Sequence, residues 1–186
     1  MTDAQPFLLQ MAGAPGTGKS RVAAAIAAAE PAIIINSDTV KSTLLRQGVT
    51  WDLAGRAAYH VLFELADDLL GQGHNVILDS PSHYAFIPAN GQRVAEKHGA
   101  RYRFLELTCA DLGELRRRLG ERAPKRSQML DLDTPPSDAS APSQATRIGT
   151  HQWEVAKPDV GVLILDAGPG VSPQHIALAA LHHVRT

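Results

Sequence analysis

The segment from Gly13 to Ser20 is the feature that most constrains the fold of this chain. It reads Gly-Ala-Pro-Gly-Thr-Gly-Lys-Ser, which fits the Walker A spacing G-x-x-x-x-G-K-[ST], and it joins a short apolar run, 7–11, to an alanine-rich stretch, 19–30. Glycines let successive backbone N–H groups point inward at phosphate oxygens, and the N-terminus of the following helix adds about half a positive charge. The order strand, loop, helix therefore predicts a loop that binds the phosphates of a nucleotide.

The last two residues of this loop have distinct expected roles. Lys19 is placed to reach the β and γ phosphates of a nucleoside triphosphate, and Ser20 to hold Mg²⁺. ATP and Mg²⁺ are the expected cofactors, although the motif itself also allows GTP; no N-K-x-D segment favours guanine. The expected nucleotide-binding residues of this region are Gly13, Ala14, Pro15, Gly16, Thr17, Gly18, Lys19, Ser20 and Arg21.

Apolar runs alternate with helical patterns along the rest of the chain. The further strands are expected at 32–36, 76–79, 101–107 and 160–165, and the further helices from about 39 and at 51–70, 92–98, 111–122 and 173–184. Such alternation predicts an α/β fold with a parallel sheet covered by helices on both faces. A chain of 186 residues with 44% hydrophobic residues suits one compact domain, 1–186.

Composition and charge narrow the classes of partner. The formal net charge is −1 and the sequence pI is about 6.7, so no global positive field favours long nucleic acid or an anionic membrane. The first residues lack the pattern of a signal peptide, and no apolar stretch approaches the roughly 20 residues of a membrane span. The single cysteine, Cys109, cannot form an internal disulfide. We therefore expect a soluble cytoplasmic protein.

Polar residues at strand ends are candidates for the chemistry, because ligands of parallel α/β sheets bind beyond the carboxyl ends of the strands. Asp38 follows the strand 32–36 and can accept the proton of an acceptor hydroxyl as that hydroxyl attacks the γ phosphorus. It equally fits an N-cap of the next helix. Lys41 lies one helical turn further and can neutralise phosphate or an anionic acceptor, or lie in solvent. Asp79 ends the strand 76–79 and is expected to bind Mg²⁺, with a loop cap as the alternative.

The loop after this strand is expected to line the acceptor pocket. His83 and Tyr84 lie in it, and they are candidate substrate-binding residues. A histidine without a recognisable partner is equally compatible with a structural role.

An arginine-rich stretch adjoins a long proline-rich segment. Residues 123–142 contain four prolines and little apolar periodicity, which is typical of a functional or disordered loop, and we expect 116–145 to form a lid. The helical pattern places Arg118 and Arg122 on one flank of the buried stripe, where they can contact phosphates, and Arg117 on the far side. The alternative is a solvated helix paired with Glu114 and Glu121. Basic residues cluster at Arg116, Arg117, Arg118, Arg122, Lys125 and Arg126.

Together these segments resemble the P-loop kinase group that contains polynucleotide kinase, zeta-toxin-like kinases and small proteins labelled as AAA or ATPase. The resemblance is carried by Gly13–Ser20, Ser37-Asp38 with Lys41, Leu78-Asp79-Ser80, Arg93, and Leu115–Arg122. It implies a P-loop NTPase fold of three layers, with a five-stranded parallel sheet in the order 2-3-1-4-5 and a lid after the fourth strand.

The resemblance also implies roles for single residues. Asp38 is the expected general base, and Arg122 or Arg126 the lid arginine that contacts ATP. Arg93 is expected to reach toward the acceptor. Polynucleotide kinases often have arginine where this chain has Lys41, and lysine lacks arginine's planar fork, which argues against a strict polynucleotide kinase.

These observations favour an ATP-dependent kinase for a small hydroxylated acceptor, with Lys19, Asp38 and Arg122 as its catalytic residues. Two alternatives stay open. One is a nucleic-acid 5′-hydroxyl kinase, which is less favoured because the lid holds the only basic cluster and aromatic residues make up 5% of the chain. The other is a nucleotide-binding switch or slow ATPase. The sequence leaves the acceptor and the oligomeric state unidentified.

Overall fold

A single parallel sheet organises the molecule. The structure is a computed structural model, and it describes residues 5–139 and 153–186. The strands pair in the order β2-β3-β1-β4-β5, and each neighbouring pair is parallel. This confirms the predicted strand order. The strands are β1 (Phe7–Gly13), β2 (Ile33–Asn36), β3 (Val76–Asp79), β4 (Arg101–Thr108) and β5 (Val162–Asp166).

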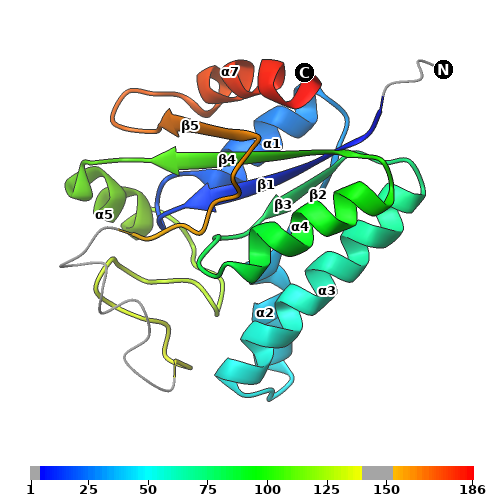
Figure 1. The fold of residues 1–186 in the computed structure, drawn as a ribbon. Coiled ribbons are helices and arrows are strands. Elements are labelled where there is room, and N and C mark those ends of the chain that lie inside the picture. The colour runs from blue at the N-terminus through cyan, green and yellow to red at the C-terminus, as the bar shows by residue number, and fades with distance from the viewer. Residues whose placement is uncertain (1–4, 140–152) are drawn as a thin grey trace.

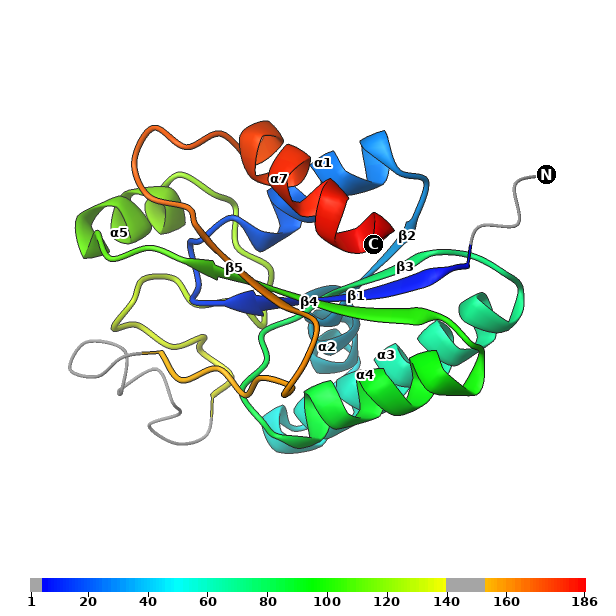
Figure 2. The same ribbon diagram turned by 45° about the horizontal axis from the view of Figure 1, so that its top comes forward.

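Helices cover both faces of the sheet, which confirms the predicted α/β class. Figures 1 and 2 show α1 and α7 on one face and α3 and α4 on the other. Each face has its own buried apolar cluster, one shared with α1 and α7 and the other with α3 and α4. The helices are α1 (Lys19–Ala29), α2 (Ser37–Arg46), α3 (Trp51–Gly71), α4 (Phe86–Lys97), α5 (Leu112–Gly120) and α7 (Pro173–Arg185).

The central strand shows why the sequence takes this arrangement. Every residue of β1 is buried, because neighbouring strands flank it on both sides and helices cover both its faces. Leu9 and Met11 belong to the core under α1 and α7, whereas Leu8 belongs to the core under α3 and α4. A strand buried on both faces is a continuous apolar run and lacks polar alternation, which is what residues 7–12 provide, apart from Gln10.

Two helices begin earlier than the sequence predicted. The predicted start at residue 92 was wrong for α4, which begins at Phe86. Pro88 lies in its first turn, where proline removes no helical hydrogen bond. Gly91 is required by packing, since a Cβ there would lie 2.6 Å from the Tyr102 ring. Helix α2 begins at Ser37 rather than near residue 39.

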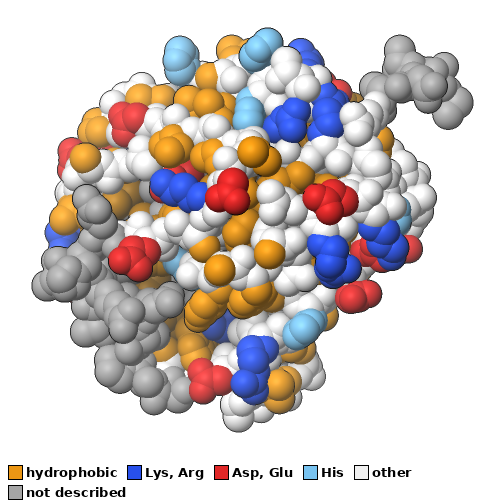
Figure 3. All heavy atoms as spheres, viewed as in Figure 1, with side chains coloured by type: hydrophobic (Ala, Val, Ile, Leu, Met, Phe, Trp, Pro, Cys, Tyr) orange, Lys and Arg blue, Asp and Glu red, His pale blue; other side chains and the backbone are white. Residues whose placement is uncertain are grey.

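The carboxyl ends of the strands carry the segments expected to form the lid. In Figure 1, α5 and the irregular segment that follows it lie beyond these ends. Residues 140–145 of the expected lid lie outside the described residues. Figure 3 shows that acidic and basic side chains are interspersed on the face drawn, in keeping with the net charge of −1. None of the helices in residues 5–139 and 153–186 combines the length and apolar character of a membrane span.

Candidate active site

A cavity of about 1370 Å³ opens at the carboxyl ends of the strands. One end of it is formed by the phosphate loop, α5 and the start of α7, and the other by α2, α3 and the loop between β3 and α4. Most of the residues predicted for the site lie in its wall. They are Pro15, Gly16, Thr17, Gly18, Lys19, Ser20, Arg21, Asp38, Lys41, Asp79, His83, Tyr84, Arg118 and Arg122.

The phosphate loop depends on glycine at its first position. Gly13 has φ of 128°, and a Cβ added there would lie 2.3 Å from the carbonyl oxygen of Leu107 on β4. Any other residue would be both strained and in collision with backbone. The loop is closed by Thr17, whose Oγ1 donates to the carbonyl oxygen of Ala14 at 2.8 Å. This turn directs the chain into α1.

Lys19 lies folded onto the loop itself. Its Nζ donates to the carbonyl oxygens of Gly13 at 2.8 Å and Ala14 at 3.0 Å. Burial lowers its pKa to about 8, although the negative charges of Asp79 and Asp38 act in the opposite direction. The ammonium group therefore lies in the cavity wall, near two carboxylates. Phosphate oxygens can take the place of the two carbonyl oxygens that now accept its hydrogen bonds.

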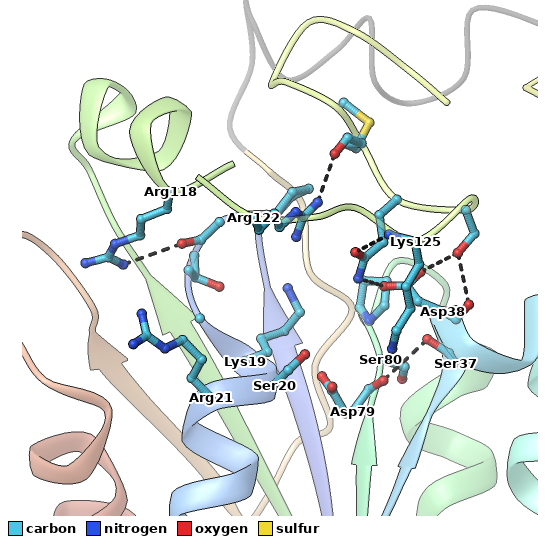
Figure 4. Close-up of a pocket in the computed structure, with 18 of the residues that line it drawn as sticks. Lys19, Ser20, Arg21, Ser37, Asp38, Asp79, Ser80, Arg118, Arg122 and Lys125 are labelled. Atoms are coloured by element: carbon cyan, nitrogen blue, oxygen red, sulfur yellow. Dashed lines mark hydrogen bonds between the residues drawn. The ribbon is translucent and has the colours of Figure 1, made fainter. Parts of the chain in front are cut away.

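Ser20 and Asp79 are the residues that can hold a metal ion. Figure 4 shows Ser20 at the start of α1 and Asp79 at the end of β3, both at the floor of the pocket beside Lys19. Asp79 is buried, and its carboxylate accepts a hydrogen bond from the side-chain amide of Asn36. Mg²⁺ at nucleotide sites takes most of its ligands from phosphate oxygens and water, so one hydroxyl and one carboxylate fit this ion. No group of three or more His, Cys, Asp or Glu side chains suited to a metal occurs within the described residues.

Asp38 does not cap α2. That role belongs to Asn36, whose side-chain oxygen accepts from the backbone N–H of Thr39 at 2.9 Å. Asp38 lies in the first turn of α2, with both carboxylate oxygens bonded to the lid. Ser127 Oγ donates to Oδ1 at 3.0 Å, and Gln128 Nε2 donates to Oδ2 at 2.8 Å. The interpretation as a cap was therefore wrong, and Asp38 lines the cavity.

Lys41 lies in α2, one helical turn beyond Asp38. Its Nζ is 3.2 Å from the ring centroid of Trp51, at the start of α3. Burial lowers the pKa of Lys41 to about 8, against the opposing charges of Asp38 and Asp52. The cation–π contact holds this ammonium group against α3, so it is not a freely solvated surface lysine.

Arg118 and Arg122 approach the cavity in different ways. Arg118 Nη1 donates to the carbonyl oxygen of Ala167 at 2.8 Å, and its Nε donates to Glu114 at 2.7 Å. It thus ties α5 to the segment after β5, close to the phosphate loop (Figure 4). Arg122 donates to the carbonyl oxygen of Met129 at 2.9 Å. Burial lowers the pKa of Arg122, and the charge of Asp38 opposes this effect, so the guanidinium lies within electrostatic reach of the expected base.

Four predicted residues do not contribute to the wall of this cavity: Gly13, Ala14, Arg93 and Arg126. Arg126 forms a two-pronged ion pair with Asp138, with both N–O distances 2.7 Å, and Arg93 Nη2 donates to Asn90 at 3.3 Å. Arg117 is paired with Glu114 and Glu121, as expected for the alternative of a solvated helix with ion pairs.

Lys125 also lines the cavity, although no specific role was predicted for it. Its Nζ donates to Asn36 Oδ1 at 2.9 Å and to Thr39 Oγ1 at 2.7 Å. The lysine therefore joins the lid to the first turn of α2, beside Asp38 (Figure 4). Its only signal in the sequence was its membership of the basic cluster.

His83 is held by a segment far away in the sequence. Its ring centroid is 4.1 Å from that of Trp153, and the backbones of Ser82 and Ala156 are hydrogen bonded at 2.7 Å. Burial, with the positive charge of Lys19, lowers the pKa of His83 to about 4. The imidazole is therefore neutral at pH 7. Further aromatic residues in the cavity wall, which the sequence analysis missed, are Trp51, Tyr59, Phe86 and Trp153.

Comparisons with known proteins agree with this geometry. Residues 8–137 match the family model described as AAA domain. A comparison with curated proteins finds no match. Among solved structures, the chain is similar to APS kinase from Mycobacterium tuberculosis in complex with AMPPNP and APS, with a TM-score of 0.65 and 19% identity over 98% of this chain and 99% of that one.

Two further kinase structures have the same fold. The chain resembles a sugar kinase from Janibacter, with a TM-score of 0.64 and 16% identity over 96% of this chain and 94% of that one. It also resembles a gluconokinase from Sinorhizobium meliloti, with a TM-score of 0.58 and 18% identity over 97% and 93% of the two chains. Since the family model spans well over half of the sequence, the protein belongs to the AAA domain family, and it has the fold of these three kinases.

Proposed function

We propose that this protein is a kinase that transfers the γ-phosphoryl group of ATP to a hydroxyl group of a small acceptor. The observation that carries the proposal is the meeting of Lys19 and Asp38 in one cavity, from two different strand ends. A phosphate-binding ammonium group and a carboxylate that faces the acceptor side are the two groups that phosphoryl transfer to an alcohol requires.

In this proposal the phosphates of ATP replace the contacts that Lys19 makes with the loop. The ammonium group then binds the β and γ phosphates, and Arg122 and Arg118 approach from the lid side to stabilise the charge that develops on the transferring group. Ser20 and Asp79 hold Mg²⁺, which neutralises phosphate charge when it is bound. Each of these side chains lines the same cavity.

Asp38 is the proposed general base. It accepts the proton of the acceptor hydroxyl while the hydroxyl oxygen forms its bond to the γ phosphorus and the bond to the bridging oxygen of ADP breaks. Ser127 and Gln128 occupy its oxygens at 3.0 and 2.8 Å. The acceptor hydroxyl either replaces one of these two contacts or uses a remaining lone pair of the carboxylate.

The names of similar structures support an acceptor of modest size. They are a sugar kinase, a gluconokinase and APS kinase, which all phosphorylate small molecules. A cavity of about 1370 Å³ has room for ATP together with such an acceptor.

The test is product formation. The protein is incubated with ATP, Mg²⁺ and single acceptors from a panel of sugars, nucleosides and 5′-hydroxyl oligonucleotides, and phosphorylated acceptor is detected by mass spectrometry. We expect a phosphorylated small molecule, and we expect Lys19→Ala to lower its rate of formation by at least about tenfold because a phosphate contact is lost. Phosphorylation of oligonucleotides alone, or release of inorganic phosphate alone, would contradict the proposal.

A further inference from the structure

The cavity holds most of the aromatic surface that this chain can offer to a ligand. Aromatic residues make up 5% of the sequence. Yet both tryptophans, two of the three tyrosines and one phenylalanine line this cavity. Random placement of so few rings would not gather them around one ligand site. The five are Trp51, Tyr59, Tyr84, Phe86 and Trp153.

Three of these rings, those of Tyr59, Tyr84 and Phe86, pack against one another and form what we call the platform. Tyr84 and Phe86 are stacked, with centroids 5.6 Å apart and planes 13° apart. Tyr59 meets both rings edge to face, at 6.5 and 5.6 Å, and its hydroxyl donates to the carbonyl oxygen of Pro81 at 3.2 Å. Tyr84 and Phe86 nevertheless stay 47% and 45% exposed. Tyr59 therefore packs against both rings, and Tyr84 and Phe86 keep surface that a ligand can contact.

The platform lies on the acceptor side of the proposed chemistry. It is formed by α3 and by residues after β3, whereas the nucleotide end of the cavity lies below α7 and the segment after β5. In the sheet order, β3 and β5 are on opposite sides of β1, which carries the phosphate loop. The charge of Asp38 acts on Tyr59, which puts the proposed base within electrostatic reach of the platform.

The charges at this end of the cavity do not favour a cationic ligand over a neutral one. Lys41 already lies over the ring of Trp51 at 3.2 Å, and the charged residues of the wall are mixed, with Asp38 and Asp52 near Lys41 and Arg56. Stacking of a planar ring on aromatic side chains tolerates many ring types and stabilises binding substantially.

We propose that the acceptor carries a planar aromatic ring that stacks on the Tyr84–Phe86 platform and directs a hydroxyl group of the same molecule toward Asp38. This inference rests on the proposed kinase function and names its acceptor class. Open-chain polyols and simple sugars lack the ring and are expected to bind weakly.

The experiment compares matched ligands that differ only in the ring. Phenyl β-D-glucopyranoside is paired with methyl β-D-glucopyranoside, and adenosine with methyl β-D-ribofuranoside. Binding is followed in the presence of Mg²⁺ and the ATP analogue AMPPNP, so that the nucleotide end is filled and no turnover occurs. Because both tryptophans line the cavity, intrinsic tryptophan fluorescence reports directly on its occupancy.

We expect the ring-bearing member of at least one pair to bind with a Kd about tenfold or more lower than its partner. Phe86→Ala and Phe86→Leu should both remove this preference, since leucine keeps apolar volume but offers no ring face. Leu178→Ala is the control, because it removes an exposed apolar side chain from α7, on the other face of the sheet. The Kd for AMPPNP should stay unchanged in all three variants.

Failures of the two proposals are separable. Equal Kd values within both pairs, no binding by either ring-bearing probe, or a preference that survives in both Phe86 variants would overturn the ring inference. Ring-dependent binding without any phosphorylated product would support the inference and contradict the kinase. Equal phosphorylation of the two members within both pairs would support the kinase and overturn the inference.

Discussion

At the scale of single residues, Lys19 and Lys41 are two ammonium groups in one cavity, and burial lowers the pKa of each to about 8. Below pH 8 both are charged, and above it each loses its proton in the free protein. The phosphates of ATP favour the charged form of a lysine that they contact. ATP binding above pH 8 must therefore take up a proton at Lys19.

This uptake is measurable by titration calorimetry at pH 8.5 in buffers of different ionisation enthalpy. We expect roughly half a proton or more to be taken up per ATP bound, and we expect the affinity for ATP to fall as the pH rises above 8. Lys41→Met is the control, since it removes the other group with a pKa of about 8. Uptake that disappears in Lys41→Met, or that is absent from the unaltered protein, would contradict the role given to Lys19.

At the scale of elements, the lid is joined to α2 by a small set of hydrogen bonds around Ser127. Its backbone N–H donates to Ser42 Oγ at 3.0 Å, and its hydroxyl donates to Asp38 at 3.0 Å. Lys125 adds contacts to Asn36 and Thr39. Since each such bond contributes only about 1 kcal/mol, the lid can open without unfolding the sheet.

Removal of the Ser127 hydroxyl should loosen this junction. In Ser127→Ala, we expect amide hydrogen exchange of residues 123–128 to rise about fivefold, which corresponds to one lost hydrogen bond, while exchange in the strands stays unchanged. Thr43→Ala is a matched control, because the Thr43 hydroxyl bonds to Thr39 within α2. Equal exchange in the two variants would show that Ser127 does not hold the lid.

Binding of ATP should act on the same segment in the opposite direction. Arg118 lies in α5, Arg122 follows its end, and both line the cavity. Phosphates that attract these arginines will therefore order the residues between α5 and Ser127. We expect exchange of residues 121–128 to slow at least severalfold when ATP and Mg²⁺ are added. Exchange that ignores the nucleotide would contradict the assignment of this segment as a lid.

At the scale of the whole molecule, the sequence was sufficient for the architecture. Residues 13–20 placed a strand and a helix on either side of one loop, and the alternation of apolar runs with helical patterns then required a parallel sheet. The strand order came from the family resemblance, and the structure confirms it. The start of α4 was missed because Pro88 and Gly91 are weak helix formers. Proline is tolerated in the first turn of a helix, and the glycine at position 91 is explained by its packing against Tyr102.

The site was predictable where residues belong to the phosphate loop, lie near a strand end or follow a helical pattern. Asp79 ends β3 and Asp38 lies two residues after β2, so the geometry of a parallel sheet brings them into the cavity. Arg126 was assigned from the family resemblance, and its partner Asp138 on the irregular segment has no periodic signal. Trp153 reaches His83 from about seventy positions away, a contact that no local pattern encodes.

The measurement that tests the central claim most directly is acceptor-dependent release of ADP by the unaltered protein and by Asp38→Asn. The substitution keeps the size of the side chain and its ability to accept a hydrogen bond, but it removes the basic carboxylate. With an acceptor that the protein phosphorylates, we expect Asp38→Asn to lower kcat roughly 100-fold or more, with little change in the KM for ATP. Asp68→Asn, on the exposed side of α3, should retain full activity. Undiminished acceptor-dependent turnover in Asp38→Asn would contradict the proposed mechanism.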